Sequence, residues 1–129
     1  MINEENKFKK LTEEASDVLG LSYQFLKDKY KSYPICLLEY FEKEVNRKSI
    51  EVRFDNEETT LTCYFNDEEK CDSAYLFPDH DKHLEDFISY LTDSHDYSFI
   101  KSRFMLDNCY LKVKEMKELR RDICLMFYR

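Results

Sequence analysis

Glycine and proline are scarce in this chain, which has one glycine, two prolines and no tryptophan among its 129 residues. A Gly-rich phosphate loop needs several glycines close together, so the composition leaves few sites for one. It argues equally against long flexible linkers. The scarcity therefore predicts regular helices and strands that are joined by short polar turns.

Long hydrophobic runs are absent as well. No stretch approaches the roughly 18 apolar residues of a membrane span, and the first residues, "MINEENKFKK", lack the apolar segment of a signal peptide. The five cysteines form no CxxC pair, and an odd number cannot all be paired within one chain. We expect a soluble, cytoplasmic protein that contacts no membrane, with reduced cysteines that mostly act as small buried hydrophobes.

Large apolar side chains are plentiful. Apolar residues make up 43% of the chain and include ten tyrosines and ten phenylalanines, which is enough to offset the ordering entropy of folding. A chain of this length forms one core. We therefore expect a single folded domain over residues 1–129.

The net charge of −7 is unevenly distributed along the chain. Residues 67–96 hold ten acidic and two basic side chains, whereas residues 97–129 hold four acidic and eight basic ones. An acidic middle segment repels phosphates and attracts a basic protein. The charge pattern thus predicts a basic protein partner and no nucleic acid, although acidic charge also simply keeps proteins soluble.

The first third of the chain predicts one helix and leaves the next stretch open. Phe8, Leu11, Ala15 and Val18 follow the spacing of one helical face, so a helix is expected from about residue 3 to 19, capped by Gly20. The aromatic-rich stretch that follows is either two strands around a turn, or a strand and then a helix that starts at Pro34. Whether residues 33–47 form a strand or a helix stays undecided.

The middle of the chain carries the clearest β signal. In "SIEVRFD" apolar and charged residues alternate, and "TTLTCYF" returns with alternation after the polar "NEE" turn. These two segments predict an antiparallel hairpin, and "CDSAYLF" after "NDEEK" predicts a third strand. The three segments together make a meander.

Helices are expected again towards the C-terminus. Leu84, Phe87, Ile88 and Leu91 lie at helical spacing, which predicts an amphipathic helix over about residues 80–93. The apolar residues after residue 97 suggest one or two further helices, although "ICLMFYR" could be a short edge strand. The predicted fold class is α+β: an antiparallel β-meander of three to five strands, packed by an N-terminal helix and two or three C-terminal helices.

The segment "FPDHDKHLEDF" admits two interpretations. His80 and His83, with Asp79 or Asp81, have ligand types and spacing that suit zinc or iron. The same residues also suit a helix start, in which Asp79 caps the helix and the other carboxylates complement its dipole. We favour the helix start, because three ligands from one turn are crowded, and we therefore predict no metal and no cofactor.

Signs of catalysis are few. Acidic neighbours of Cys71 raise the pKa of a thiol instead of lowering it, and the paired carboxylates lie in predicted turns or on a solvated helix face. No GxSxG or Walker sequence is present. We predict a protein that is not an enzyme.

Basic residues cluster near the C-terminus in "KVKEMKELRRD". Acidic residues interrupt them at helical ion-pair spacing, which favours a solvated helix face over a nucleic-acid site. The basic residues concerned are Lys112, Lys114, Lys117, Arg120 and Arg121.

The order of predicted elements resembles that of small immunity proteins from bacterial polymorphic toxin and contact-dependent inhibition systems. The resemblance rests on the helix ending at "LG", the aromatic-rich stretch, the hairpin "SIEVRFDNEETTLTCYF", the closing helix and the acidity. It implies a bacterial, cytoplasmic, non-catalytic inhibitor that binds and neutralises one cognate toxin domain, frequently a basic nuclease. Charge complementarity with such a domain would speed association and exclude wrong partners.

The predicted partner-binding residues are acidic and lie in two turns and at the start of the helix near residue 80. They are Glu57, Glu58, Asp67, Glu68, Glu69, Asp72, Asp79 and Asp81. Aromatic anchors would supply much of the affinity, and the sequence does not single them out. The alternative function is a small metal-dependent enzyme or metal sensor built on His80 and His83, and a phosphate-mimicking inhibitor of a DNA-binding protein is a third possibility. The oligomeric state stays open.

Overall fold

The computed structural model describes residues 4–42, 45–116 and 122–129, which form one antiparallel sheet and three helices. The helices are α1 (Glu4–Asp17), α2 (Tyr23–Lys29) and α3 (Asp81–Ser94). None of these helices has the length and apolar character needed to cross a bilayer. The strands in chain order are β1 (Ile35–Glu42), β2 (Val45–Phe54), β3 (Thr59–Phe65), β4 (Cys71–Pro78), β5 (Asp96–Ser98), β6 (Arg103–Met105), β7 (Tyr110–Met116) and β8 (Asp122–Tyr128).

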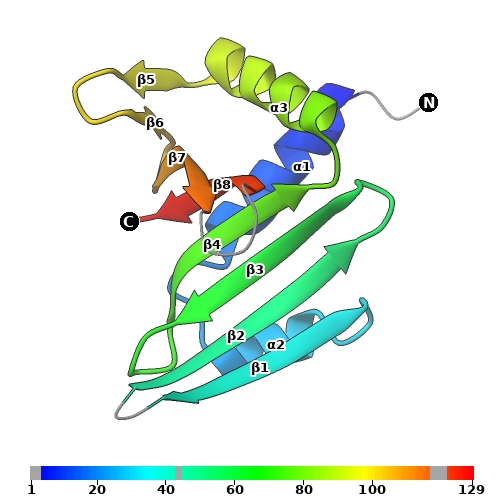
Figure 1. The fold of residues 1–129 in the computed structure, drawn as a ribbon, viewed down its shortest axis with the longest axis vertical. Coiled ribbons are helices and arrows are strands. Elements are labelled where there is room, and N and C mark those ends of the chain that lie inside the picture. Colours follow the sequence, from blue (N-terminus) through cyan, green and yellow to red (C-terminus); the bar gives the residue numbers. More distant parts are fainter. Residues whose placement is uncertain (1–3, 43–44, 117–121) are drawn as a thin grey trace.

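The sheet consists of two four-stranded meanders that meet at its centre. The strand order is β1-β2-β3-β4-β8-β7-β6-β5, and every neighbouring pair is antiparallel. After β4 the chain passes through α3 to the far edge, and β5 to β8 then return towards β4 (Figure 1). The contact between β4 and β8 joins segments that lie about fifty residues apart in the sequence.

The predicted α+β class holds, but the predicted arrangement of three to five strands with two or three C-terminal helices is wrong. The described residues after 95 form the four strands β5 to β8. Leu111 and Val113 alternate with Lys112 and Lys114 in β7, which is the period of a strand. Strand β8 is apolar on both faces because it lies between β4 and β7, so "ICLMFYR" is a strand but not an edge strand.

The N-terminal third follows the prediction only as far as its first helix. Helix α1 agrees with the predicted helix but ends at Asp17, so Gly20 does not cap it. Gly20 has φ +84°, and its N–H donates to the Cys71 carbonyl at 2.8 Å, so it joins the chain after α1 to the start of β4. Both interpretations of the next stretch placed a strand before Pro34, whereas the structure has α2 there and β1 after it. The α2 start is fixed by the Ser22 hydroxyl, which accepts a hydrogen bond from the Phe25 N–H at 3.1 Å.

The predicted hairpin and third strand are confirmed as β2, β3 and β4. Their register places Val52 opposite Leu61, and Leu61 opposite Leu76, so that one face is continuously apolar. Helix α1 packs on this face against β4 and β8, and α2 packs against β2, behind the strands in Figure 1. The largest fully buried side chains of this core are Tyr30, Phe54, Phe87, Phe127, Leu11, Leu26, Ile50, Leu61, Leu76, Leu91, Leu111 and Leu125.

The opposite face of β4, β8 and β7 carries tyrosines that lie under cationic side chains. The Arg103 guanidinium lies 3.5 Å from the centroid of the Tyr110 ring, and the Lys114 ammonium lies 5.7 Å from that of Tyr75. The predicted helix face of basic residues is therefore wrong for Lys112 and Lys114, which lie on β7. Lys117, Arg120 and Arg121 lie outside the described residues.

The five cysteines, all among the described residues, form no disulfide. Cys63, Cys109 and Cys124 are buried, as their apolar sequence surroundings predict, and Cys71 is buried as well. Cys36 is the exception, because β1 is an edge strand and leaves this side chain exposed. Burial raises the pKa of Cys109 to about 11. The pKa of Cys63 is raised by its hydrogen bond with Cys71 and by burial, so the thiols of Cys63 and Cys109 stay protonated at neutral pH.

Candidate functional site

A groove of about 480 Å³ lies where β4 ends and α3 begins. Strands β2 and β3 contribute polar side chains to one wall, and the start of α3 contributes the other. The residues that line it are Glu51, Thr60, Thr62, Phe77, Pro78, Asp79, His80, Asp81, Leu84 and Ile123. The groove thus places carboxylates beside the apolar side chains of β4, α3 and β8.

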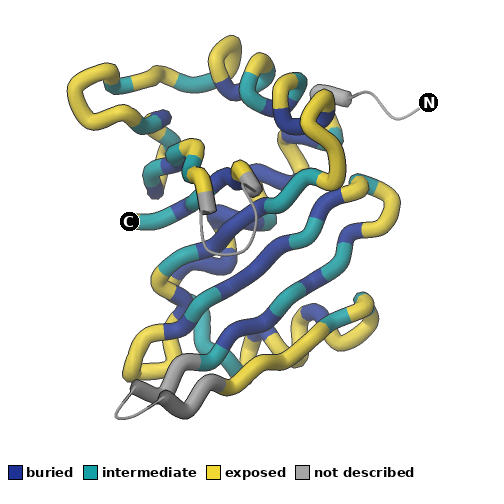
Figure 2. The backbone as a smooth tube through the Cα atoms, in the orientation of Figure 1, coloured by how far each residue is buried: buried dark blue, intermediate teal, exposed yellow. Residues whose placement is uncertain are grey.

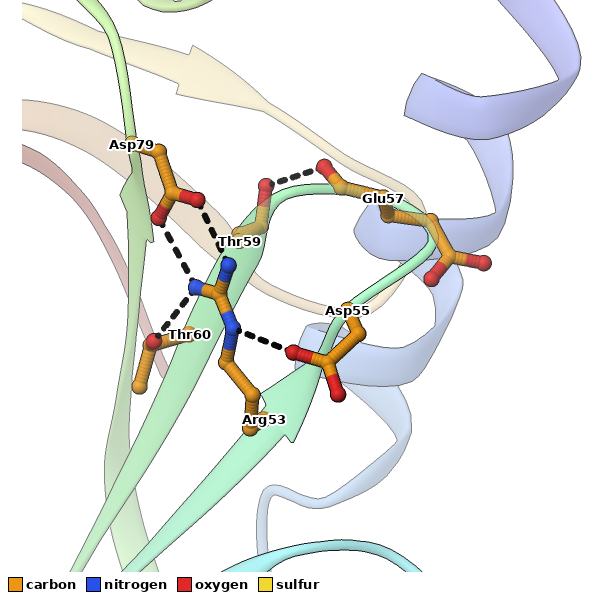
Figure 3. Close-up of polar contacts among 6 residues, drawn as sticks. All are labelled: Arg53, Asp55, Glu57, Thr59, Thr60 and Asp79. Atoms are coloured by element: carbon orange, nitrogen blue, oxygen red, sulfur yellow. Dashed lines mark hydrogen bonds and ion pairs between the residues drawn. The ribbon is translucent and has the colours of Figure 1, made fainter.

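Arg53 organises the polar rim of this groove (Figure 3). Its Nη1 and Nη2 donate to the two carboxylate oxygens of Asp79 at 2.8 and 2.5 Å. Its Nε donates to Asp55 at 3.0 Å, and Nη1 also donates to the Thr60 hydroxyl at 3.1 Å. The hydrogen bonds from Arg53 lower the pKa of Asp79, so this carboxylate stays ionised and held in place.

The turn between β2 and β3 is tied to both β4 and α1. The Asp79 N–H donates to the Glu58 carbonyl at 2.9 Å, which fixes the end of β4 beside the turn. The Lys10 ammonium of α1 lies 2.6 Å from the Glu57 carboxylate, and their hydrogen bond raises the pKa of Lys10. Glu58 has φ +49° and remains exposed. These contacts hold the turn between β2 and β3 against β4 and α1.

The predicted helix start is confirmed, but the predicted cap is wrong. Helix α3 begins at Asp81, and its N-cap residue is His80, whose side chain makes no cap hydrogen bond. Asp79 lies one residue too early and accepts hydrogen bonds from Arg53 instead. A bidentate guanidinium is a stronger partner for a carboxylate than two backbone N–H groups at a helix end.

The two histidines of the proposed metal site face different surroundings. His80 is exposed at the groove, whereas His83 is buried and its ring lies 5.6 Å from that of Phe8. Over residues 4–42, 45–116 and 122–129, no group of three or more His, Cys, Asp or Glu side chains is placed to hold a metal ion. The geometry therefore gives no support to the metal interpretation.

The turn between β3 and β4 forms a separate acidic surface. The Asn66 side chain accepts hydrogen bonds from the Glu68 and Lys70 N–H groups, each at 3.0 Å, which closes the turn locally. Glu69 forms an ion pair with Lys48 of β2. Strand β3 spans seven residues, so this turn lies roughly 20 Å from the turn between β2 and β3.

The structure therefore divides the predicted partner-binding residues into two sets. Glu57, Glu58, Asp79 and Asp81 lie together near the groove. The remaining four lie at the opposite end of β3, in the turn before β4 and at its start: Asp67, Glu68, Glu69 and Asp72. No single flat surface at one end of the meander holds all eight.

Several groove residues were missed by the sequence prediction. Glu51, Arg53 and Asp55 alternate with the core residues of β2, so they were interpreted only as its solvent face. The same alternation is the signal that could have found them, because it places all three on one side of the sheet. Only the pairing of β2 with β3, and of β3 with β4, brings that side next to Asp79.

The groove is suited to a cationic side chain with an aliphatic stem. Among the described residues, no ion pair involves Glu51 or Asp81, so their charges are available to a ligand. Phe77, Leu84 and Ile123 offer apolar surface to a methylene chain. Arginine and lysine combine these two requirements, since their stems pack on apolar surface while their heads meet carboxylates.

Comparisons of the chain with family models, with curated proteins and with solved structures gave no match.

Proposed function

We propose that this protein is a non-catalytic interaction protein of the immunity type, which binds and neutralises a basic, nuclease-type toxin domain in the bacterial cytoplasm. The groove between β4 and α3 carries the proposal, since it sets Glu51 and Asp81 beside apolar side chains. A nuclease presents arginine and lysine side chains to phosphate, and such side chains would fill the groove. A nuclease whose arginine and lysine side chains are bound in the groove could not bind nucleic acid with them.

The surroundings of the groove support a preorganised binding surface. Arg53 holds Asp79 by two hydrogen bonds, and Lys10 holds the neighbouring turn through Glu57. Groups that are fixed before binding lose little freedom on association, so more of the contact energy appears as affinity.

The first experiment is capture of partners from a lysate of the source bacterium with the wild-type protein as bait, at low and moderate salt. Mass spectrometry should identify one basic protein with a toxin-like domain. The purified domain should then lose nucleic-acid cleavage when the wild-type protein is added. Failure to recover such a domain, or recovery without inhibition, would contradict the proposal.

Charge reversal then distinguishes the two acidic surfaces. Asp81→Lys should weaken binding of the captured domain by roughly 30-fold at low salt and reduce the salt dependence of binding. The matched control is Glu68→Lys, at the other end of β3, which should change the affinity less than about 3-fold. The reverse ranking would move the contact surface to Asp67, Glu68, Glu69 and Asp72. Titration calorimetry measures both variants.

A further inference from the structure

Two large apolar side chains stand almost fully exposed at the tip of the β5–β6 hairpin. Phe99 is 87% exposed and Ile100 is 96% exposed. Figure 2 shows the whole turn as exposed, and in Figure 1 the hairpin extends away from the sheet beyond the end of α3. Single exposed hydrophobic residues are ordinary, whereas two adjacent ones at a turn, where Gly, Asn or Asp are usual, need a reason.

Local contacts support the hairpin tip. The Phe99 ring packs edge-on against Tyr97 with centroids 5.1 Å apart, and Tyr97 packs against the buried Phe104 at 4.9 Å. The Ser98 hydroxyl accepts a hydrogen bond from the Lys101 N–H at 3.3 Å. An aromatic side chain that is fixed in this way loses little entropy when a partner covers it.

The surface between the groove and the hairpin tip is acidic. Glu85 and Asp93 lie on the exposed side of α3, and Asp96 follows at the start of β5. The exposed Lys82 forms an ion pair with Asp86 of the same helix, which balances one of the helix's acids. A basic protein that reaches from the groove to the hairpin would meet this charge favourably, while an anionic lipid surface would be repelled by it.

We infer that Phe99 and Ile100 are the apolar anchor of the interface, and that they insert into an apolar pocket on the same basic protein whose cationic side chains enter the groove. This inference rests on the proposed function. It divides the interface into two parts: the groove and α3 select the charge of the partner, and the hairpin tip supplies the buried apolar contact. The sequence did not single out the anchors among its twenty tyrosines and phenylalanines. The inference names Phe99 as the aromatic anchor, together with its neighbour Ile100.

The test measures the affinity of two serine variants for the toxin domain captured by the wild-type bait. Phe99→Ser and Ile100→Ser should each weaken binding by roughly 10- to 100-fold. These losses should persist at high salt because the contact is apolar, whereas the loss caused by Asp81→Lys should shrink as salt rises. The matched control is Phe25→Ser, which removes a half-exposed phenylalanine from α2 and should leave the affinity within about 2-fold.

The results of these measurements show whether the toxin domain binds the hairpin tip. Unchanged affinity of both tip variants, with a loss in Asp81→Lys, would overturn the inference and leave the proposed function standing. Capture of no basic domain would overturn both the inference and the proposed function.

Two further measurements test other occupants of the hairpin tip. Wild-type binding to vesicles of phosphatidylcholine and phosphatidylglycerol at roughly 7:3, lost in Phe99→Ser, would make the tip a membrane anchor instead. A dimer in sedimentation equilibrium that Phe99→Ser dissociates would make a second copy the occupant. Thermal unfolding of each variant verifies that the exposed substitutions leave the fold intact.

Discussion

The two ends of strand β3 carry similar acidic turns but differ in what surrounds them. At one end, the turn with Glu57 and Glu58 is bound to α1, to β4 and to the Arg53 network, and a groove opens beside it. At the other end, the turn with Asp67 and Glu68 closes on its own Asn66, and the groove does not extend to it. An exposed ion pair joins it to β2, and the Tyr23 N–H donates to its Glu69 carbonyl at 2.9 Å. Acidic composition alone therefore does not mark a site, because a site also needs walls and fixed partners.

Asp79 and Asp81, both predicted as partner-binding residues, differ in their own contacts. Asp79 is committed to Arg53 and builds the rim of the groove, while Asp81 lines the groove without an ion pair among the described residues. One carboxylate therefore shapes the surface and the other is available to a ligand. If the groove end of β3 is held more firmly than the other end, substitutions there should lower the stability more.

The largest expected effect concerns the aromatic side chains beneath each end. Phe54, the last residue of β2, is buried and packs against both Tyr30 and Tyr33 at the groove end. Phe54→Ala should lower the free energy of unfolding by about 3 to 4 kcal/mol, because it removes a ring and leaves a cavity. Urea denaturation at neutral pH measures this loss.

The matched variant at the other end is Phe65→Ala. Its ring is also buried, but Tyr23 is the aromatic residue it packs against, at 5.2 Å. We expect a smaller loss of about 2 to 3 kcal/mol. A loss equal to or greater than that of Phe54→Ala would show that the groove end is not the more firmly held of the two.

An intermediate effect is expected from the cations that hold the two turns. Arg53→Met removes the bidentate pair with Asp79 and the bonds to Asp55 and Thr60, and it should lower the stability by about 1 to 2 kcal/mol. Lys48→Met removes the exposed pair with Glu69 and the contact of the ammonium with the Tyr23 ring, and should lower it by less than about 1 kcal/mol. Equal changes in urea denaturation for the two variants would contradict the difference in their surroundings.

The smallest effect is a pH dependence that only the groove end should show. Arg53 lowers the pKa of Asp79. A carboxyl group of this kind stabilises the fold above its unfolded pKa of about 3.9, and the contribution is lost as the pH falls through the lower folded value. Asp79→Asn should therefore lower stability most above about pH 4, and its difference from wild type should shrink towards pH 2.

The control for this pH dependence is the same substitution in the Arg53→Met background. Without the guanidinium, Asp79→Asn should have little effect at any pH, because the interaction that lowers the pKa is gone. Urea denaturation of the four variants at several pH values provides the comparison. A pH-dependent difference that survives Arg53→Met would assign the effect to another group.

Sequence patterns predicted the elements that have one buried and one solvated face. Helix α1, the strands β2 to β4 and helix α3 were predicted because their apolar residues recur at the period of the element. The short helix α2 was missed, since seven residues give too little periodicity to be distinguished from a strand. Strands β6 and β7 were mistaken for helices, and β8 was left open between a helix and a short edge strand, because β8 is apolar on both sides and β6 has only three residues.

The candidate site was predictable only in part, because local sequence patterns do not show which distant segments pair. Asp79 and Asp81 were recognised from the local pattern around Pro78, and the turn acids from their composition. Glu51 lines the groove only through the pairing of β2 with β3, and Ile123 only through the pairing of β8 with β4. Arg53 reaches Asp79 at the rim through the pairing of β2, β3 and β4. Such partners lie far along the chain, and no local pattern indicates them.

By itself the sequence determined the acidic net charge, the hairpin at the centre of the chain, the helix start after Pro78 and the absence of a Gly-rich phosphate loop. Each of these follows from composition or from short-range periodicity, which act within a few residues. The tertiary structure alone decided that β8 inserts beside β4, that the eight acids divide between two ends, and that Phe99 and Ile100 remain exposed. These features depend on which distant segments pair, and that choice depends on burial across the whole sheet.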